Sequence, residues 1–429
     1  MKKMLKKSLV LAVSAGIATL SLQTQATVGY FSHGYGIKAK GMGGAGVALP
    51  QDSLAAATNP AGMVLVGNRW DVGAEVFVPD REASTAWGTQ LSTNTITAYD
   101  GNGDGFGESW FLIPEIGYNK MVNKNLSWGV SVFGNGGMNT TWNAPIFSVG
   151  TNPTQNTGID LSQLFISPTL SFKLDDKNSV GVSVNVVYQS IKIEGVSDFG
   201  GISSDPTKLS DQGYDGSYGV GFRVGWIGQL TDTVSAGFTY QPKTNMKPFE
   251  DYAGLFAEGG DFDIPANYAL GVSWKATPKL TLAFDVEQIK YSGVKSIANV
   301  NNAFTTGGQL GTSTGPGFGW DDMTVYKLGG NFQVNKDLVV RAGWTHGSQP
   351  IPATETLFNV LAPAVVEDHL TVGFTYTMND GELSGYYMHA FEETVNGSGV
   401  ATFPGAQNAG GANIGMSQNA FGIAYGKKF

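Results

Sequence analysis

The chain has 429 residues, no cysteine, only four histidines and a formal net charge of −9. The lack of cysteine excludes a disulfide scaffold and Cys-based zinc or nucleophile chemistry, and the acidic balance argues against nucleic acid as a partner. Charged residues make up 14% of the chain, against about 25% in typical soluble domains, and 60 residues are glycine.

The first 26 residues have the features of a secretory signal peptide. Four lysines precede an apolar run from Ser8 to Leu22, and small residues follow where a signal peptidase reads. The run is shorter than the roughly 20 residues that a membrane-spanning helix needs. We therefore predict a signal peptide at 1–26 and a mature chain of formal charge −13, because the four lysines leave with it.

The next segment, 27–69, is rich in glycine and lacks strand alternation. Its GMGGAG at 41–46 fits the G-x-G-x-x-G pattern of dinucleotide sites, but no strand precedes it and no strand–helix alternation follows. Asp52 and Ser53 predict the cap of one short helix over LAAA, which Asn59-Pro60 ends. We expect the segment to plug the lumen of the strands that follow; a loose periplasmic tail is the alternative.

Apolar residues alternate with small or polar ones through the rest of the chain, which indicates strands. In the last one, Phe421, Ile423 and Tyr425 share a face opposite glycine and alanine. Arg223 and Arg341 fall on the small-residue face of their strands, so that face should line a lumen and the apolar face should meet lipid. The predicted strands are 70–78, 111–120, 125–134, 160–173, 178–194, 216–229, 232–241, 265–275, 279–292, 322–333, 337–347, 365–377, 382–394 and 414–429.

The connections between these strands alternate between short polar turns and long segments. Examples of the short kind are VNKN at 122–125 and TPK at 277–279, and of the long kind 135–159 and 242–264. This alternation is typical of outer-membrane barrels with short periplasmic turns and long outer loops. We predict an all-β fold: a transmembrane up-and-down antiparallel β-barrel of about 14 strands over 70–429.

Several segments resemble one family of outer-membrane proteins. Asn59-Pro60-Ala61 after AKGMGGAGVALPQDSLAAAT resembles the NPA-containing hatch of the FadL/TodX family of transporters for long-chain fatty acids and other hydrophobic compounds. The resemblance extends to IPANYALGVSWKATPKLTLAFDVEQIKYSG at 264–293, VVRAGWTHGSQPIP at 339–352 and MHAFEETVNG at 388–397. It covers most of the mature chain.

The resemblance implies a 14-stranded barrel in the outer membrane of a Gram-negative bacterium, plugged by an N-terminal hatch over 27–69. It implies passive uptake of hydrophobic small molecules, either fatty acids or hydrocarbons, by a monomer that contacts membrane lipid and lipopolysaccharide. A solute would pass from an apolar groove among the outer loops to an inner pocket and leave through a gap in the wall. No cofactor, metal or catalytic residue is expected.

The same resemblance assigns the first candidate site residues. Asn59, Pro60 and Ala61 match the hatch motif and should line or support the passage, unless they form a turn with only a folding role. The family has a kinked third strand at its lateral gap. Glycine inside a strand often marks a bulge, so Gly134, Gly136 and Gly137 are the lateral-opening candidates here; simple loop entry is the alternative.

The apolar groove is predicted from loop composition. No charged residue occurs from 134 to 158, where Trp142, Ile146 and Phe147 form an apolar cluster, and Leu255 and Phe256 could supply the opposite wall. Packing against the barrel rim is the competing interpretation.

The substrate's charge stays open at this point. Acidic residues outnumber basic ones in the long loops, which would not attract a carboxylate. Arg223 and Arg341 in the lumen could still pair with one, so both fatty acids and neutral hydrocarbons are kept.

Two rival functions and one possible ion site remain. GTSTG at 311–315 fits a nucleophile-elbow pattern but falls in a predicted loop, which disfavours a hydrolase. A non-specific porin would need more charged inward positions than this chain has. DGNGDG at 100–105 begins like a calcium loop, but Phe111 stands where a Glu is needed.

Overall fold

The computed structural model describes residues 27–85, 96–99, 109–144, 146–147, 156–300, 307–398, 400–403 and 406–429. The predicted signal peptide at 1–26 and the acidic loop at 100–105 lie outside these residues. None of the helices in the described ranges has both the length and the apolar character needed to cross a bilayer.

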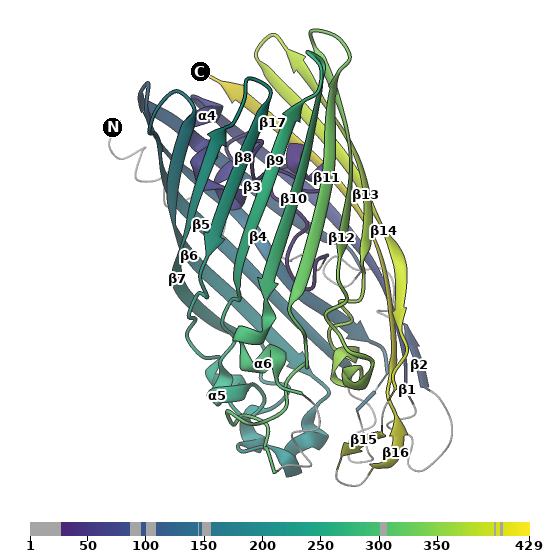
Figure 1. Cartoon of the computed structure of the whole chain (residues 1–429). Helices are drawn as coiled ribbons and strands as arrows, with labels where there is room; N and C mark the ends of the chain where they lie inside the picture. Colours follow the sequence, from purple (N-terminus) through teal and green to yellow (C-terminus); the bar gives the residue numbers. More distant parts are fainter. Residues whose placement is uncertain are drawn as a thin grey trace, which may run out of the picture.

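Fourteen long antiparallel strands form a closed barrel (Figure 1), because β1 pairs with β17 on one side and with β3 on the other. This confirms the predicted all-β, up-and-down architecture. A short strand, β2 (Ile96–Tyr99), pairs with the end of β1, and β15 (Val400–Phe403) with β16 (Ala406–Gly410) form a separate hairpin. The barrel strands are β1 (Arg69–Thr85), β3 (Phe111–Asn123), β4 (Leu126–Trp142), β5 (Thr157–Lys173), β6 (Asn178–Glu194), β7 (Asp215–Gln229), β8 (Val234–Gln241), β9 (Ala266–Lys275), β10 (Leu280–Lys290), β11 (Met323–Gln333), β12 (Leu338–Gly347), β13 (Asp368–Met378), β14 (Gly381–Val395) and β17 (Asn413–Lys428).

The two faces of the strands follow the predicted alternation. On β7, Tyr218, Val220 and Phe222 point outward and are exposed, whereas Arg223 is buried inside the barrel. Arg341 of β12 is likewise buried. The outer surface therefore carries an apolar band suited to lipid, as in other transmembrane barrels.

Two strands run well past their predicted ends. We predicted strands at 70–78 and 125–134, but β1 continues to Thr85 and β4 to Trp142. The added segments, PDREAST and NGGMNTTW, have no alternating apolar face. The pattern that marks a lipid-facing strand disappears there although backbone pairing continues.

Residues 27–68, here called the hatch, lie inside the barrel; Figure 1 shows this purple segment within the ring of strands, toward the end where the C-terminus lies. The predicted cap by Asp52 and Ser53 is wrong: the helix over Ala55–Thr58 has Leu54 at its N-cap position and no side chain caps it. Asp52 Oδ1 instead accepts a hydrogen bond from Leu54 N (3.0 Å) in the turn before the helix. The hatch contains α2 (Ile37–Lys40), α3 (Ala55–Thr58), η1 (Pro60–Gly62) and α4 (Met63–Val66).

The long loops gather at the other end of the barrel, where Figure 1 shows α5 and α6. Their short helices are η2 (Ser197–Ile202), η3 (Pro206–Lys208), η4 (Glu250–Tyr252), α5 (Ala257–Gly260), η5 (Tyr291–Gly293), α6 (Lys295–Ala298), η7 (Ala353–Glu355) and η8 (Phe358–Val360). The loops fold over the mouth and bury a large apolar cluster there.

Candidate functional site

An apolar pocket lies among the outer loops. It holds about 400 Å³ of empty space, counting the part open to solvent, and none of the described residues that line it has a charged or hydroxyl side chain. Leu255 and Phe256, two of the predicted groove residues, are in the lining. The end of β6 and four separate loops contribute the full set, which is Ile193, Val196, Phe199, Leu255, Phe256, Leu310, Pro316, Gly317, Phe318, Phe358 and Leu361.

The other three predicted groove residues pack behind this lining. Trp142, Ile146 and Phe147 are fully buried in the same cluster. The ring of Phe147 lies 5.4 Å from that of Phe199, and Trp142 Nε1 donates to the carbonyl of Val360 (2.9 Å). They therefore support the pocket wall.

A chain of aromatic rings leads from the pocket to the hatch. Phe256 of the lining lies 5.1 Å from Phe262, measured between ring centroids, and Phe262 lies 6.3 Å from Tyr30 of the hatch. Tyr30 also contacts Tyr291 (5.5 Å) and Trp320 (6.1 Å). The apolar cluster is thus continuous from the outer loops to residue 30.

The first residues of the hatch pair with β4. Ser32 N donates to the carbonyl of Asn135 (2.9 Å), and Gly137 N donates to the carbonyl of Tyr30 (2.8 Å). A Cβ at Gly136 would lie 1.8 Å from Tyr30 O, so only glycine allows this approach. Residues 30–32 thereby act as a short strand on β4.

The barrel wall is interrupted at this same place. The ladder between β3 and β4 ends at the pair Ile116–Val132, although β3 begins at Phe111 and β4 continues to Trp142. The β4–β5 ladder shifts register between Gly134 and Gly136. Gly134, Gly136 and Gly137, the predicted lateral-opening residues, all lie at this bulge.

The NPA segment joins the hatch to the opposite wall. Asn59 is buried, and its Nδ2 donates to the carbonyls of Val47 (2.8 Å), Trp226 (3.1 Å) and Phe238 (3.3 Å). Its Oδ1 accepts from Ala61 N (3.1 Å). The asparagine therefore links two parts of the hatch to β7 and β8, and it lies away from the lining of the outer pocket.

Wall glycines provide the room for this contact. A Cβ at Gly225 would lie 1.9 Å from Asn59 Oδ1, and one at Gly181 would lie 2.3 Å from the carbonyl carbon of Pro60. Ser171 Oγ donates to the carbonyl of Ala61 (3.0 Å). All three motif residues thus contact β5, β6 or β7.

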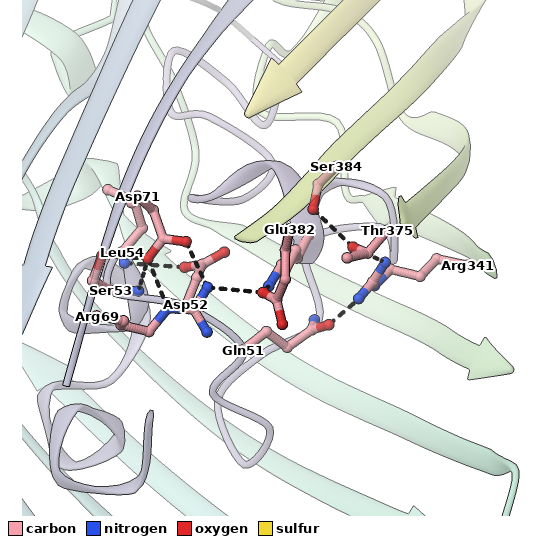
Figure 2. Close-up of polar contacts among 11 residues, drawn as sticks. Gln51, Asp52, Ser53, Leu54, Arg69, Asp71, Arg341, Thr375, Glu382 and Ser384 are labelled. Atoms are coloured by element: carbon pink, nitrogen blue, oxygen red, sulfur yellow. Dashed lines mark hydrogen bonds and ion pairs between the residues drawn. The ribbon is translucent and has the colours of Figure 1, made fainter. Parts of the chain in front are cut away.

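Charged side chains hold another side of the hatch, as Figure 2 shows around Asp71 and Glu382. Lys38 Nζ lies 2.5 Å from Glu382 Oε2, and Arg69 contacts both Asp71 (2.6 Å) and Glu382 (3.2 Å). Asp71 Oδ2 accepts from the backbone N of Ser53 (2.9 Å) and from its hydroxyl (2.5 Å).

Further wall carboxylates contact the hatch. Glu75 pairs with Lys40 (2.6 Å), Glu115 accepts from Ile37 N (2.9 Å), and Asp285 accepts from Gly46 N (2.7 Å). Each carboxylate faces a cation or a backbone N–H, which satisfies much of its need for partners after burial. Residues 36–66 are therefore attached around the lumen.

The two predicted lumen arginines occupy different settings. Arg341 Nε donates to Gln51 Oε1 (3.0 Å), and its NH1 donates to Thr375 Oγ1 (2.8 Å), as drawn in Figure 2. Arg223 donates to Gln241 Oε1 (3.0 Å) and to the carbonyl of Thr58 (3.3 Å).

A second, polar cavity of about 340 Å³ lies beside Arg223, between hatch and wall. The ion pair of Lys327 with Glu287 (2.8 Å) also lines it. Within the described ranges, no group of three or more His, Asp or Glu side chains could hold a metal ion.

A family model described as "Outer membrane protein transport protein (OMPP1/FadL/TodX)" matches residues 17–384. The comparison with curated proteins returns no match.

Solved structures share the fold at low sequence identity. The P. putida toluene transporter TodX is 17% identical with a TM-score of 0.68, covering 92% of this chain and 99% of its own. The Ralstonia pickettii toluene transporter TbuX is 19% identical with a TM-score of 0.65 and the same coverage. A Pseudomonas aeruginosa FadL homologue is 16% identical with a TM-score of 0.67, covering 93% and 99%.

Proposed function

The chain belongs to the OMPP1/FadL/TodX family of outer-membrane transport proteins, and from this we propose that it is a passive channel for neutral hydrophobic molecules such as monoaromatic hydrocarbons. Proteins of this family carry hydrophobic small molecules through outer-membrane barrels. The observation that carries the proposal is the apolar pocket, whose ring chain leads to an interrupted barrel wall.

The character of the pocket supports a neutral solute. The described residues of its lining include no cation, and moving an unpaired carboxylate out of water costs several kcal/mol or more. Apolar area gains about 25 cal/mol per Å² on leaving water. A hydrocarbon therefore enters this pocket at little cost, whereas a fatty acid must keep its head group outside it.

A fatty acid is the second candidate, and the polar cavity beside Arg223 supports it. The Arg223 guanidinium donates to Gln241 Oε1 and to the carbonyl of Thr58, which are neutral acceptors, and Glu287 lines the same cavity. The guanidinium could donate two parallel hydrogen bonds to a carboxylate that reached the cavity.

The proposed route leads sideways out of the barrel. Residues 27–35 lie on the inner side of the β3–β4 interruption. To move off β4 they must break the two backbone hydrogen bonds at Ser32 and Gly137 and the hydrogen bond from the Tyr35 hydroxyl to Asn135 Oδ1 (2.8 Å). The remainder of the hatch keeps its ion pairs and the Asn59 contacts. The solute would then pass between β3 and β4 into the bilayer.

Uptake of labelled toluene and oleate by cells that lack their own transporter tests the function and the solute class. Leu255→Asp places a charge in the pocket and should reduce toluene uptake at least tenfold, while Leu230→Asp in an exposed turn should leave it unchanged. Oleate uptake without toluene uptake would favour the fatty acid candidate, and uptake of neither by the folded protein would refute the proposal.

A further inference from the structure

One inward-facing arginine lies at the outer edge of the interrupted wall. Along β1, one edge pairs with β3 from Arg69 to Phe77 and with β2 from Glu82 to Thr85. Arg81 falls between these two ladders, and it is 1% exposed. Its side chain therefore points into the barrel at the level between the two ladders.

The facing edge is that of β4 beyond the ladder with β3. Arg81 NH1 donates to the backbone carbonyl of Asn139 and to Asn139 Oδ1 (3.1 Å). The guanidinium carbon also lies 5.9 Å from the ring centre of Phe111, the first residue of β3. One side chain thus joins β1 to β4 across the place where β3 has ended.

These contacts give the interruption an upper limit. Its lower limit is the last ladder pair, Ile116–Val132. The part of β3 above that pair, Phe111–Glu115, is paired with β1 but has no ladder pair with β4. Five residues at about 3.4 Å each span about 17 Å. The inner side is occupied by hatch residues 30–32.

We propose that Arg81 is a positioning residue that holds β4 to β1 above the lateral opening and so sets the size of the solute that can leave. A guanidinium suits this task because its fork reaches a backbone carbonyl and a side-chain oxygen together, and burial strengthens both contacts. Without it, β4 separates from β1 on the outer side of the opening, and the opening becomes longer. This inference depends on the proposed lateral route for its functional meaning.

The test measures the gap directly, by the distance between spin labels on Val78→Cys of β1 and Thr141→Cys of β4. The chain has no other cysteine, so labelling is specific. The wild-type background should give one narrow distance, and Arg81→Met a longer and broader one, shifted by an appreciable part of the strand spacing of about 4.8 Å. Arg341→Met, which removes an inward arginine on β12, is the matched control and should leave the distance unchanged. An unchanged distance in folded Arg81→Met protein would overturn the proposal.

Selectivity supplies the functional readout. The uptake ratio of a bulky hydrocarbon to toluene should rise severalfold in Arg81→Met and return toward wild type in Arg81→Lys, which keeps a donor. An unchanged ratio with a longer distance would refute the role in selectivity. If the lateral route itself is wrong, the result differs. The distance between the spin labels would still increase in Arg81→Met, but a cross-link between β3 and β4 would not stop uptake.

Discussion

Asn59 uses one side chain to bind three backbone carbonyls and one backbone N–H. Replacement by alanine leaves these buried groups without partners, which costs about 2 kcal/mol and should speed hydrogen exchange in residues 47–66 by roughly 30-fold. Asn125→Ala, in the exposed turn between β3 and β4, is the control. Equal exchange in the two variants would mean that Asn59 does not hold the hatch.

Asp261 gives the outer loops a pH dependence. Burial, together with the nearby charge of Asp263, raises the pKa of Asp261 from its ordinary 3.8 to about 7. The closed loop therefore binds a proton that an opened loop releases. The stabilisation of the closed loop by this proton is complete below pH 3.8 and is lost as the pH rises to about 7. The neighbouring Phe262 belongs to the ring chain, which connects this titration to the pocket.

Hydrogen exchange of residues 255–264 at pH 5 and pH 8, corrected for the intrinsic rate, checks this prediction. Protection should be greater at pH 5 in the native protein. Asp261→Asn should remove the difference, because asparagine does not titrate. A difference that survives in Asp261→Asn would assign the pH dependence to another group.

At the scale of elements, residues 30–32 are the part of the hatch that we expect to move, because they can leave β4 while the rest of the hatch stays in place. An alanine at Gly136 would meet Tyr30 O at 1.8 Å and force the segment off β4. Two backbone hydrogen bonds of about 1 kcal/mol each are lost, so the displaced state should become roughly tenfold more populated or more, with faster toluene uptake.

The neighbouring bulge glycine provides the control for that experiment. A Cβ at Gly134 meets Ile113 Cγ2 at 3.3 Å, a contact that a small shift relieves. Gly134→Ala should therefore leave uptake close to the native rate. Slower uptake in Gly136→Ala than in Gly134→Ala would contradict the role given to residues 30–32.

The elements also show how far the sequence predicts the molecule. Lipid contact imposes an alternation on every strand, so strands such as β6 (Asn178–Glu194) could be predicted with their bounds. The outer ends of β1 and β4 could not be predicted, because they lack the alternation that lipid contact imposes. Their residues instead suit packing against the loops and the hatch. The bulge at Gly134 could be predicted because glycine weakens the interior of a strand and therefore often marks a bulge there.

The lining of the apolar pocket could not be predicted from local sequence, because it forms only in the folded barrel. Phe199, Phe318 and Phe358 come from three loops far apart in the chain, and the local sequence of one loop does not show which aromatic side chains of the other loops it meets. Only barrel closure brings them together. Leu255 and Phe256 could be predicted because two adjacent apolar residues in a long loop indicate burial.

At the scale of the whole molecule, we propose that the solute leaves the barrel sideways between β3 and β4. A reversible cross-link between these strands tests this route most directly. A Cβ at Gly134 would lie close to Ile113, so Ile113→Cys with Gly134→Cys should form a disulfide that closes the opening. Ile116→Cys with Val132→Cys, at a pair already in the ladder, is the matched control.

The measurement is toluene uptake by cells carrying each oxidised pair, before and after reduction. If solutes leave between β3 and β4, the Ile113/Gly134 disulfide should reduce uptake to background, reduction should restore it, and the Ile116/Val132 disulfide should have no effect. Full uptake through the oxidised Ile113/Gly134 pair would contradict the account and would indicate an exit past the hatch into the periplasm.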